Sequence, residues 1–193
     1  MHYLIIKFKK EVKKAEYDNL ILFFKQLLGM NITVKEFLPN LIIEHDYDDL
    51  EMIEVIESLQ SELVYDIVVF SSKKFTSIAE LEEHQNFIYN VFNRSDNNFY
   101  DYFYDEKKFI MQVFKDFDYK LFKSFVLKKY LNDQVMIDIL QTFFKNNLNT
   151  KKTSEELFMH RNTLINKIEK FNYDTGYDVR NFYDAYIIYN LIK

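Results

Sequence analysis

The chain is best understood from one stretch, Leu157-Phe158-Met159-His160-Arg161-Asn162-Thr163-Leu164. A short helix is predicted over Lys152 to Phe158, so that it begins before this stretch and ends within it. A second helix is predicted to begin at Arg161, because apolar residues then recur every three to four positions through Phe171. His160 stands where a helix N-cap is expected. Two short helices joined by a tight turn are the pattern of a helix-turn-helix.

The predicted motif divides its residues into a packing set and an exposed set. Leu157, Met159 and Leu164 are expected to pack the two helices together, and Ser154 is small enough to let them cross closely. Glu155 is expected to point outward. The residues left to face a DNA groove are Arg161, Asn162, Thr163, Asn166 and Lys167.

The first residues of the second helix carry the side chains that read bases in DNA. Arginine pairs bidentately with guanine and asparagine with adenine, and each good pair contributes about 1–3 kcal/mol of discrimination. Arg161 and Asn162 are therefore candidates for base or phosphate contacts. His160 is also counted among the DNA-binding residues, although a capping role is the stronger interpretation of its position.

Other side chains near the motif suit the DNA backbone. Thr163 and Lys167 are expected to reach phosphates, and Lys151 and Lys152 to contact the backbone near the first helix. The whole chain has a net charge of -5, but residues 145–170 hold six basic and three acidic residues, a local charge of +3. A locally basic face on an acidic body is compatible with DNA binding.

The motif resembles the C-terminal helix-turn-helix of the PucR/CdaR family of bacterial transcription regulators. The resemblance covers residues 133–193 and rests on three runs: His160-Arg161-Asn162-Thr163-Leu164, Ile168-Glu169-Lys170 and Thr175-Gly176. In that family the first run opens the recognition helix. The chain departs from the family pattern at Ser154, where a small Ala is usual, and at Ile165-Asn166-Lys167, where the family is more basic. The resemblance implies a regulator that binds double-stranded DNA.

The N-terminal part alternates strand and helix patterns. The expected order is strand, helix, strand, strand, helix, strand, helix, over residues 3–9, 16–28, 32–38, 41–44, 50–59, 63–70 and 77–92. This order predicts an α+β fold with a ferredoxin-like antiparallel sheet covered by helices on one face. The expected domains are an α+β dimerisation or sensing domain at 1–98, a helical connector at 99–132 and the helix-turn-helix domain at 133–193. Asp178 is expected to cap the closing helix of the last.

Relatives in the resembled family often carry a degenerate cyclase-like (GGDEF-type) domain ahead of the helix-turn-helix. The N-terminal half resembles that domain in its element order alone. The chain has two glycines, Gly29 and Gly176, so it cannot form a Gly-Gly phosphate loop. Cyclase chemistry is excluded on this ground, and no other catalytic motif stands in its place.

Composition limits the remaining classes. The absence of cysteine rules out disulfides and cysteine-based metal sites. The apolar run Tyr3 to Ile6 is too short for a signal peptide, and no run approaches the roughly 20 residues of a membrane span. A cytoplasmic protein without a cofactor is expected.

Two further clusters each have two interpretations. The acidic segment from Glu44 to Asp49 offers oxygen ligands for a hard cation, but a solvated turn is the more common outcome of such a sequence, and no metal is expected. The aromatic residues from Phe99 to Tyr104 are expected to pack in a core where the two domains meet, with an effector pocket or a dimer seam as the alternatives.

The expected function is that of a DNA-binding regulator acting as a homodimer, because two half-sites multiply affinity and specificity. A small-molecule effector is a further expected partner. The alternative function is a protein-interaction or small-molecule-sensing module whose helix-turn-helix no longer binds DNA. The net negative charge and the weakened basic run at Ile165-Asn166 favour that alternative.

Overall fold

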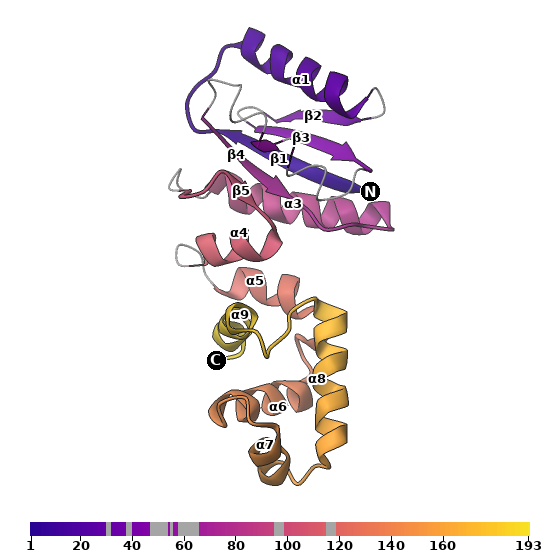
Figure 1. Cartoon of the computed structure of the whole chain (residues 1–193), viewed down its shortest axis with the longest axis vertical. Helices are drawn as coiled ribbons and strands as arrows, with labels where there is room; N and C mark the ends of the chain where they lie inside the picture. Colours follow the sequence, from indigo (N-terminus) through magenta and orange to yellow (C-terminus); the bar gives the residue numbers. More distant parts are fainter. Residues whose placement is uncertain are drawn as a thin grey trace. The chain divides into compact units, whose positions relative to one another are not determined.

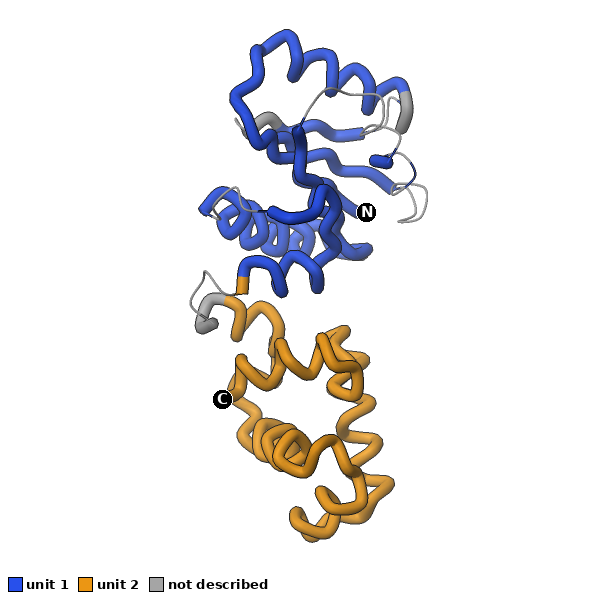
Figure 2. The backbone as a smooth tube through the Cα atoms, turned by 60° about the vertical axis from the view of Figure 1, so that its left-hand side comes forward, with its two compact units in different colours: residues 1–113 blue, residues 114–193 orange. Residues whose placement is uncertain are grey.

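The chain folds into two compact units, Met1–Val113 and Phe114–Lys193 (Figures 1 and 2). The structure is a computed structural model. It describes residues 1–29, 32–37, 40–46, 54, 56, 57, 66–94, 99–114 and 119–193. In these ranges no helix has both the length and the apolar character needed to cross a membrane. The boundaries expected after residues 98 and 132, which separate the sensing domain, the connector and the helix-turn-helix domain, stay predictions.

The first unit contains a mixed sheet. Its described strands are β1 (His2–Phe8), β2 (Thr33–Phe37), β3 (Asn40–His45), β4 (Ile67–Ser71) and β5 (Phe103–Tyr104). Their order is β2-β3-β1-β4-β5; β1 pairs antiparallel with β3 and β4, and the short β5 runs parallel to β4. The first four strands have the order and pairing of a ferredoxin-like sheet. The predicted α+β class is confirmed.

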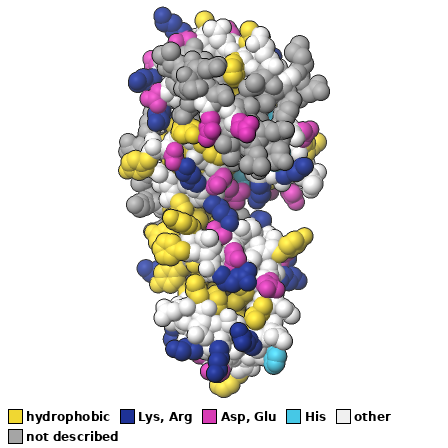
Figure 3. Space-filling view, in the orientation of Figure 1, with side chains coloured by type: hydrophobic (Ala, Val, Ile, Leu, Met, Phe, Trp, Pro, Cys, Tyr) yellow, Lys and Arg dark blue, Asp and Glu magenta, His cyan; other side chains and the backbone are white. Residues whose placement is uncertain are grey.

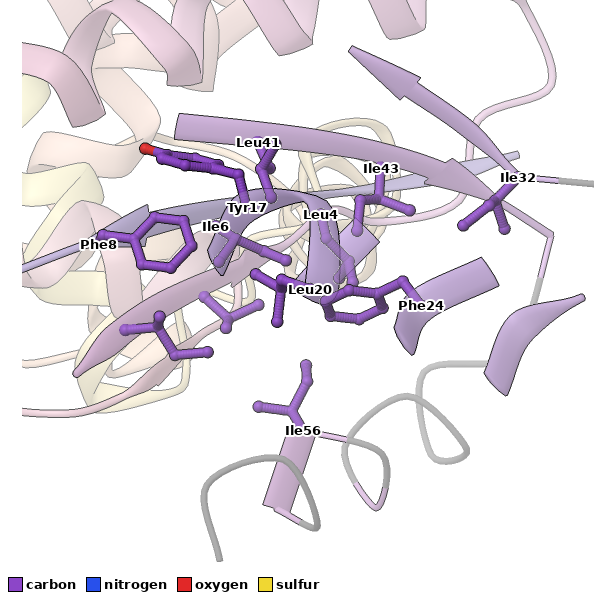
Figure 4. Packing of buried hydrophobic residues seen from close by; sticks show 12 residues of the cluster. Leu4, Ile6, Phe8, Tyr17, Leu20, Phe24, Ile32, Leu41, Ile43 and Ile56 are labelled. Atoms are coloured by element: carbon purple, nitrogen blue, oxygen red, sulfur yellow. The ribbon is translucent and has the colours of Figure 1, made fainter. Parts of the chain in front are cut away.

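One face of the sheet packs on α1 (Lys14–Leu28). The buried side chains of this cluster, shown in Figure 4, include Leu4, Ile6, Phe8, Tyr17, Leu20, Phe24, Leu41 and Ile43. Ile56, from the connection between β3 and β4, is fully buried in the same cluster. The helix predicted over Leu50 to Leu59 otherwise lies outside the described residues.

The opposite face of the sheet packs on α3 (Ile78–Arg94) and α4 (Glu106–Val113). The Tyr3 hydroxyl lies 2.6 Å from Nδ1 of His84 in α3, and Lys7 Nζ donates to the Phe92 carbonyl at 3.0 Å. All seven residues of β1 are buried. The prediction that helices cover only one face is therefore wrong. The physical reason is the unbroken apolar run in β1, which can be buried only between two layers.

The aromatic residues at 99–104 are divided between core and surface. Phe99 and Tyr104 are buried, and the Phe99 ring centroid lies 5.1 Å from that of Phe92 and 5.3 Å from that of Tyr104. Tyr100 is 91% exposed. Packing inside the first unit therefore accounts for Phe99 and Tyr104, but not for Tyr100.

The described part of the acidic segment forms ion pairs. Glu44 pairs with Lys35 on the neighbouring strand β2, and Asp46 lies 3.0 Å from the amino group of Met1. Asp48 and Asp49 lie outside the described residues. Within the described residues, no three His, Asp or Glu side chains are grouped so that they could hold a metal ion.

The described part of the second unit is helical. Its elements are α5 (Tyr119–Leu127), the short 3-10 helix η1 (Lys128–Tyr130), α6 (Gln134–Lys145), α7 (Thr150–Glu156), α8 (Arg161–Thr175) and α9 (Phe182–Ile192). Its buried residues include Ile139, Leu140, Phe143, Leu164, Ile168, Phe171, Ile187, Ile188 and Leu191. The apolar spacing that predicted the second helix of the motif is thus the buried stripe of α8.

Candidate nucleic-acid interface

The first helix of the motif, α7, is displaced by two residues from its predicted position. It begins at Thr150 because Asn149 caps it: the Asn149 side-chain oxygen accepts a hydrogen bond from the Lys152 N–H at 3.0 Å. It ends at Glu156 because the backbone turns left-handed at Phe158, which has a φ of 50°. The prediction that it extends to Phe158 is wrong for this reason.

Two hydrogen bonds fix the turn between α7 and α8. The Phe158 N–H donates to the Glu155 carbonyl at 3.2 Å, and the Met159 N–H donates to the Ser154 carbonyl at 2.9 Å. This pair of bonds is a Schellman motif, in which the residue just past the C-cap adopts a left-handed conformation. Phe158 occupies that position, and its side chain is 98% exposed.

The start of α8 is at Arg161, as predicted, and His160 is its N-cap. His160 Nδ1 accepts a hydrogen bond from the Asn162 N–H at 3.3 Å, and the His160 carbonyl accepts one from the Leu164 N–H at 3.1 Å. The cap satisfies one of the unpaired donors at the helix start and fixes the direction in which the first turn points.

The contact between α7 and α8 uses smaller residues than expected. Ser154 and Leu164 are buried as predicted, whereas Leu157 and Met159 are half-buried. Thr153, which the apolar spacing did not single out, is fully buried, and its hydroxyl donates to the Asn149 carbonyl at 2.8 Å. A hydroxyl satisfied within its own helix allows Thr to serve as a small packing residue.

The side chains predicted to bind DNA are all exposed. They are Lys151, Lys152, His160, Arg161, Asn162, Thr163, Asn166 and Lys167. They lie on α7, at the N-cap of α8 and on the first two turns of α8, where Lys and Arg side chains gather on the face seen in Figure 3. Elements close in sequence thus place these groups together.

Among the described residues, the ion pairs near the start of α8 do not involve Arg161 or Lys167. The Glu156 carboxylate accepts hydrogen bonds from Lys145 Nζ at 2.6 Å and from Asn146 Nδ2 at 2.8 Å, and these two bonds lower its pKa. In the described part of the chain, neither Arg161 nor Lys167 forms an ion pair. Their positive charge is available to a ligand from outside.

The far end of α8 is held in place. Gly176, with a φ of 84°, ends the helix, and its N–H donates to the Asn172 carbonyl at 2.8 Å. Just before it, the Asp174 carboxylate lies 2.7 Å from Lys129 Nζ and accepts a 2.5 Å hydrogen bond from the Tyr130 hydroxyl. Burial and this carboxylate raise the pKa of Tyr130, and the bond from Lys129 lowers that of Asp174. The short helix η1 therefore holds the C-terminal end of α8 in place.

The closing helix α9 is capped by Asn181, whose side-chain oxygen accepts a 2.9 Å hydrogen bond from the Tyr183 N–H. The prediction that Asp178 caps this helix is wrong. Its carboxylate instead accepts hydrogen bonds from the Arg180 guanidinium at 2.9 Å and from Asn172 Nδ2 at 2.9 Å. Asp178 thus ties the loop after α8 to α8 itself.

The geometry of α6 to α9 agrees with a comparison of the sequence with known families. Residues 136–190 match the family model described as the PucR C-terminal helix-turn-helix domain. This part of the chain is therefore similar to a PucR-type helix-turn-helix domain. The match includes α7, the turn and α8, so the predicted family resemblance is confirmed for the motif that carried it.

A solved structure resembles the chain over nearly its whole length. It is the crystal structure of a regulator of polyketide synthase expression from Bifidobacterium adolescentis, with a TM-score of 0.54 and 13% sequence identity. The similarity covers 98% of this chain and 77% of that one. At this identity the likeness concerns the fold, in which an α+β unit precedes the PucR-type domain. No curated protein sequence matches the chain.

Proposed function

We propose that the chain is a transcriptional regulator that binds double-stranded DNA by placing the start of α8 in the major groove. The observation that carries the proposal is the exposed, positively charged set of side chains at that end of a PucR-type domain. Helix-turn-helix proteins place the N-terminal residues of the second helix against base edges in this way.

The side chains have different roles in this proposal. Arg161 and Asn162, in the first turn of α8, contact bases or phosphates, and Asn166 lies one turn further along. Thr163 and Lys167 reach phosphates, while Lys151 and Lys152 contact the backbone from α7. His160 sets the direction of the helix through its cap and lies within reach of the same DNA.

The regulator acts as a homodimer on two half-sites, because a single helix-turn-helix buries little surface on DNA. The first unit provides the dimer contact, senses a small-molecule effector, or does both. These assignments are supported by the expected needs of a helix-turn-helix protein and by analogy. A regulator of bacterial genes works in the cytoplasm.

The decisive experiment measures fluorescence anisotropy with DNA from upstream of the protein's own gene, at low and at physiological salt. Arg161→Ala should weaken specific binding about 10- to 100-fold, the effect of losing one bidentate contact between a side chain and a base. The matched control is Arg180→Ala, which removes the same charge from an exposed arginine paired with Asp178. It should bind nearly as the wild type does.

The salt dependence separates this function from its alternative, a sensing or interaction module that does not bind DNA. Binding through phosphates releases counterions, so the affinity of the wild type should fall steeply as salt rises. The proposal is contradicted if the wild type does not bind, or if wild type and Arg161→Ala bind unrelated DNA as strongly as the upstream DNA. Either result favours the alternative, which the net charge of -5 supports.

A further inference from the structure

Phe158 is the most exposed of the large apolar side chains in the described part of the chain. Its side chain is 98% exposed, and no aromatic ring in that part stacks on it. Tyr100 and Tyr173 are also exposed, but each carries a hydroxyl that water can solvate. The phenyl ring of Phe158 has no such group, so its exposure is unfavourable in the free protein.

The backbone at Phe158 is also unfavourable for a residue with a side chain. Three helices of the second unit have a left-handed residue at or just past the C-cap: Asn147 follows the cap of α6, Phe158 follows the cap of α7, and Gly176 is the cap of α8. Glycine and asparagine are the residues that suit this conformation. A phenylalanine there is strained by roughly 1–2 kcal/mol. Within the described chain, Phe158 is exposed and strained without any packing in return.

The position of Phe158 indicates what the ring contacts. It lies in the turn that leads into α8, two residues before the cap His160 and three before Arg161. The exposed cations Lys151, Lys152 and Arg161 lie on the two helices that this turn joins. A partner that suits an apolar ring among cations is anionic and presents apolar groups of its own. DNA meets both conditions, because the major groove displays the thymine methyl groups between two rows of phosphates.

We propose that Phe158 is a specificity-determining DNA contact whose ring packs against a thymine 5-methyl group in the major groove. This inference rests on the proposed function, since it requires α8 to dock in that groove. It adds to the polar contacts an apolar one that selects thymine over cytosine at a neighbouring position.

The test combines a protein change with a DNA change. Wild type and Phe158→Ala are titrated by anisotropy against the upstream DNA, and against the same DNA in which uracil replaces every thymine, so that only 5-methyl groups are removed. Phe158→Ala should weaken binding to thymine DNA by about fourfold or more, the effect of losing one methyl contact. On uracil DNA the two proteins should bind with nearly equal affinity.

Two further variants separate DNA contact from folding. Phe158→Gly relieves the left-handed strain, so it should raise thermal stability while it weakens DNA binding as Phe158→Ala does. Phe182→Ala removes another phenyl ring that is 75% exposed, at the start of α9, and should leave both affinities unchanged.

The outcomes distinguish the inference from the function on which it rests. If the wild type binds and Arg161→Ala weakens it, but the Phe158 variants bind both DNAs as the wild type does, the inference fails and the function stands; the ring then serves another partner. An equal loss on thymine and uracil DNA also overturns the inference, because the methyl group is then not what the ring contacts. If the wild type binds no DNA, both fail.

Discussion

Two sets of polar side chains, one in each unit, differ in burial. In the first unit the set around His84 is buried and paired: the Tyr3 hydroxyl lies 2.6 Å from His84, and His84 Nε2 lies 2.9 Å from a Glu106 carboxylate oxygen. In the second unit, Arg161 and Asn162 stand in solvent at the start of a helix. A buried, satisfied network fixes one packing arrangement, whereas exposed polar groups are available to a ligand.

The difference indicates where substitutions will be felt. Changes in the buried core of the first unit should appear as losses of stability, because these side chains pack against one another. Changes at the start of α8 should appear as losses of binding with little effect on folding. The predictions below test this division, beginning with the largest expected effect.

Truncating the core of the first unit should give the largest loss of stability. Phe24 is fully buried against the sheet, so Phe24→Ala should lower the unfolding free energy by about 3–5 kcal/mol through lost burial and a cavity. Denaturant unfolding followed by circular dichroism measures the change. Leu22→Ala, at a position on the same helix that is 54% exposed, is the control and should cost far less. Equal effects of the two variants would contradict the assigned core.

Removing the charge of Glu106 should have a smaller and pH-dependent effect. Burial acts to raise the pKa of this carboxyl, but hydrogen bonding to His84 and the charge of Lys73 outweigh it, and the pKa is lowered. Glu106→Gln should cost roughly 1–3 kcal/mol at neutral pH, as expected for a hydrogen bond to a charged group.

The sign of the pH dependence follows from the lowered pKa. The contribution of Glu106 is fully present above its unfolded pKa of about 4.3, and it is lost as the pH falls through the folded value. The stability difference between wild type and Glu106→Gln should therefore shrink below about pH 4. Glu83→Gln, on the exposed side of α3, is the control. A difference that stays constant down to pH 2 would refute the assignment.

The smallest effect is expected at the cap of α9. Asn181→Ala removes the acceptor for the Tyr183 N–H and should cost about 1 kcal/mol. Hydrogen exchange of α9 peptides should report this loss, while the affinity for DNA stays at the wild-type value. Asn132→Ala, an exposed asparagine that caps no helix, serves as the control. A loss of DNA affinity in Asn181→Ala would show that the division between stability and binding residues is too sharp.

Much of this fold could be predicted because local rules determined it. The period of α8, its start at Arg161 and its end at Gly176 follow from apolar spacing, an N-cap and a left-handed glycine. The order of the first four strands followed from the order of strand and helix patterns, whereas the short parallel strand β5 was not predicted. The two-sided burial of β1 was not predicted, although its sequence signal is present: Tyr3 to Ile6 is an unbroken apolar run rather than an alternating one.

The features that were predicted wrongly depend on which of several neighbouring residues takes a given role. A sequence pattern does not decide between such neighbours. Asp178 and Asn181 are both good cap residues. The Asp178 carboxylate accepts a hydrogen bond from Arg180, and Asn181 is the residue that caps α9. Leu157, Phe158 and Met159 are three consecutive apolar residues in one turn. A turn cannot bury all of them, and the backbone conformation decided that Phe158 is the exposed one.

The anchoring of α8 by η1 bears on how this domain can be moved between proteins. Residues 136–190 define the family match, but Lys129 and Tyr130, which hold Asp174, lie before that range. The Tyr130 ring also lies 5.0 Å from the buried ring of Phe171. A chimera that receives only the matched residues would lose both contacts and expose Phe171. The exchangeable module is therefore the whole second unit, from Phe114 onward.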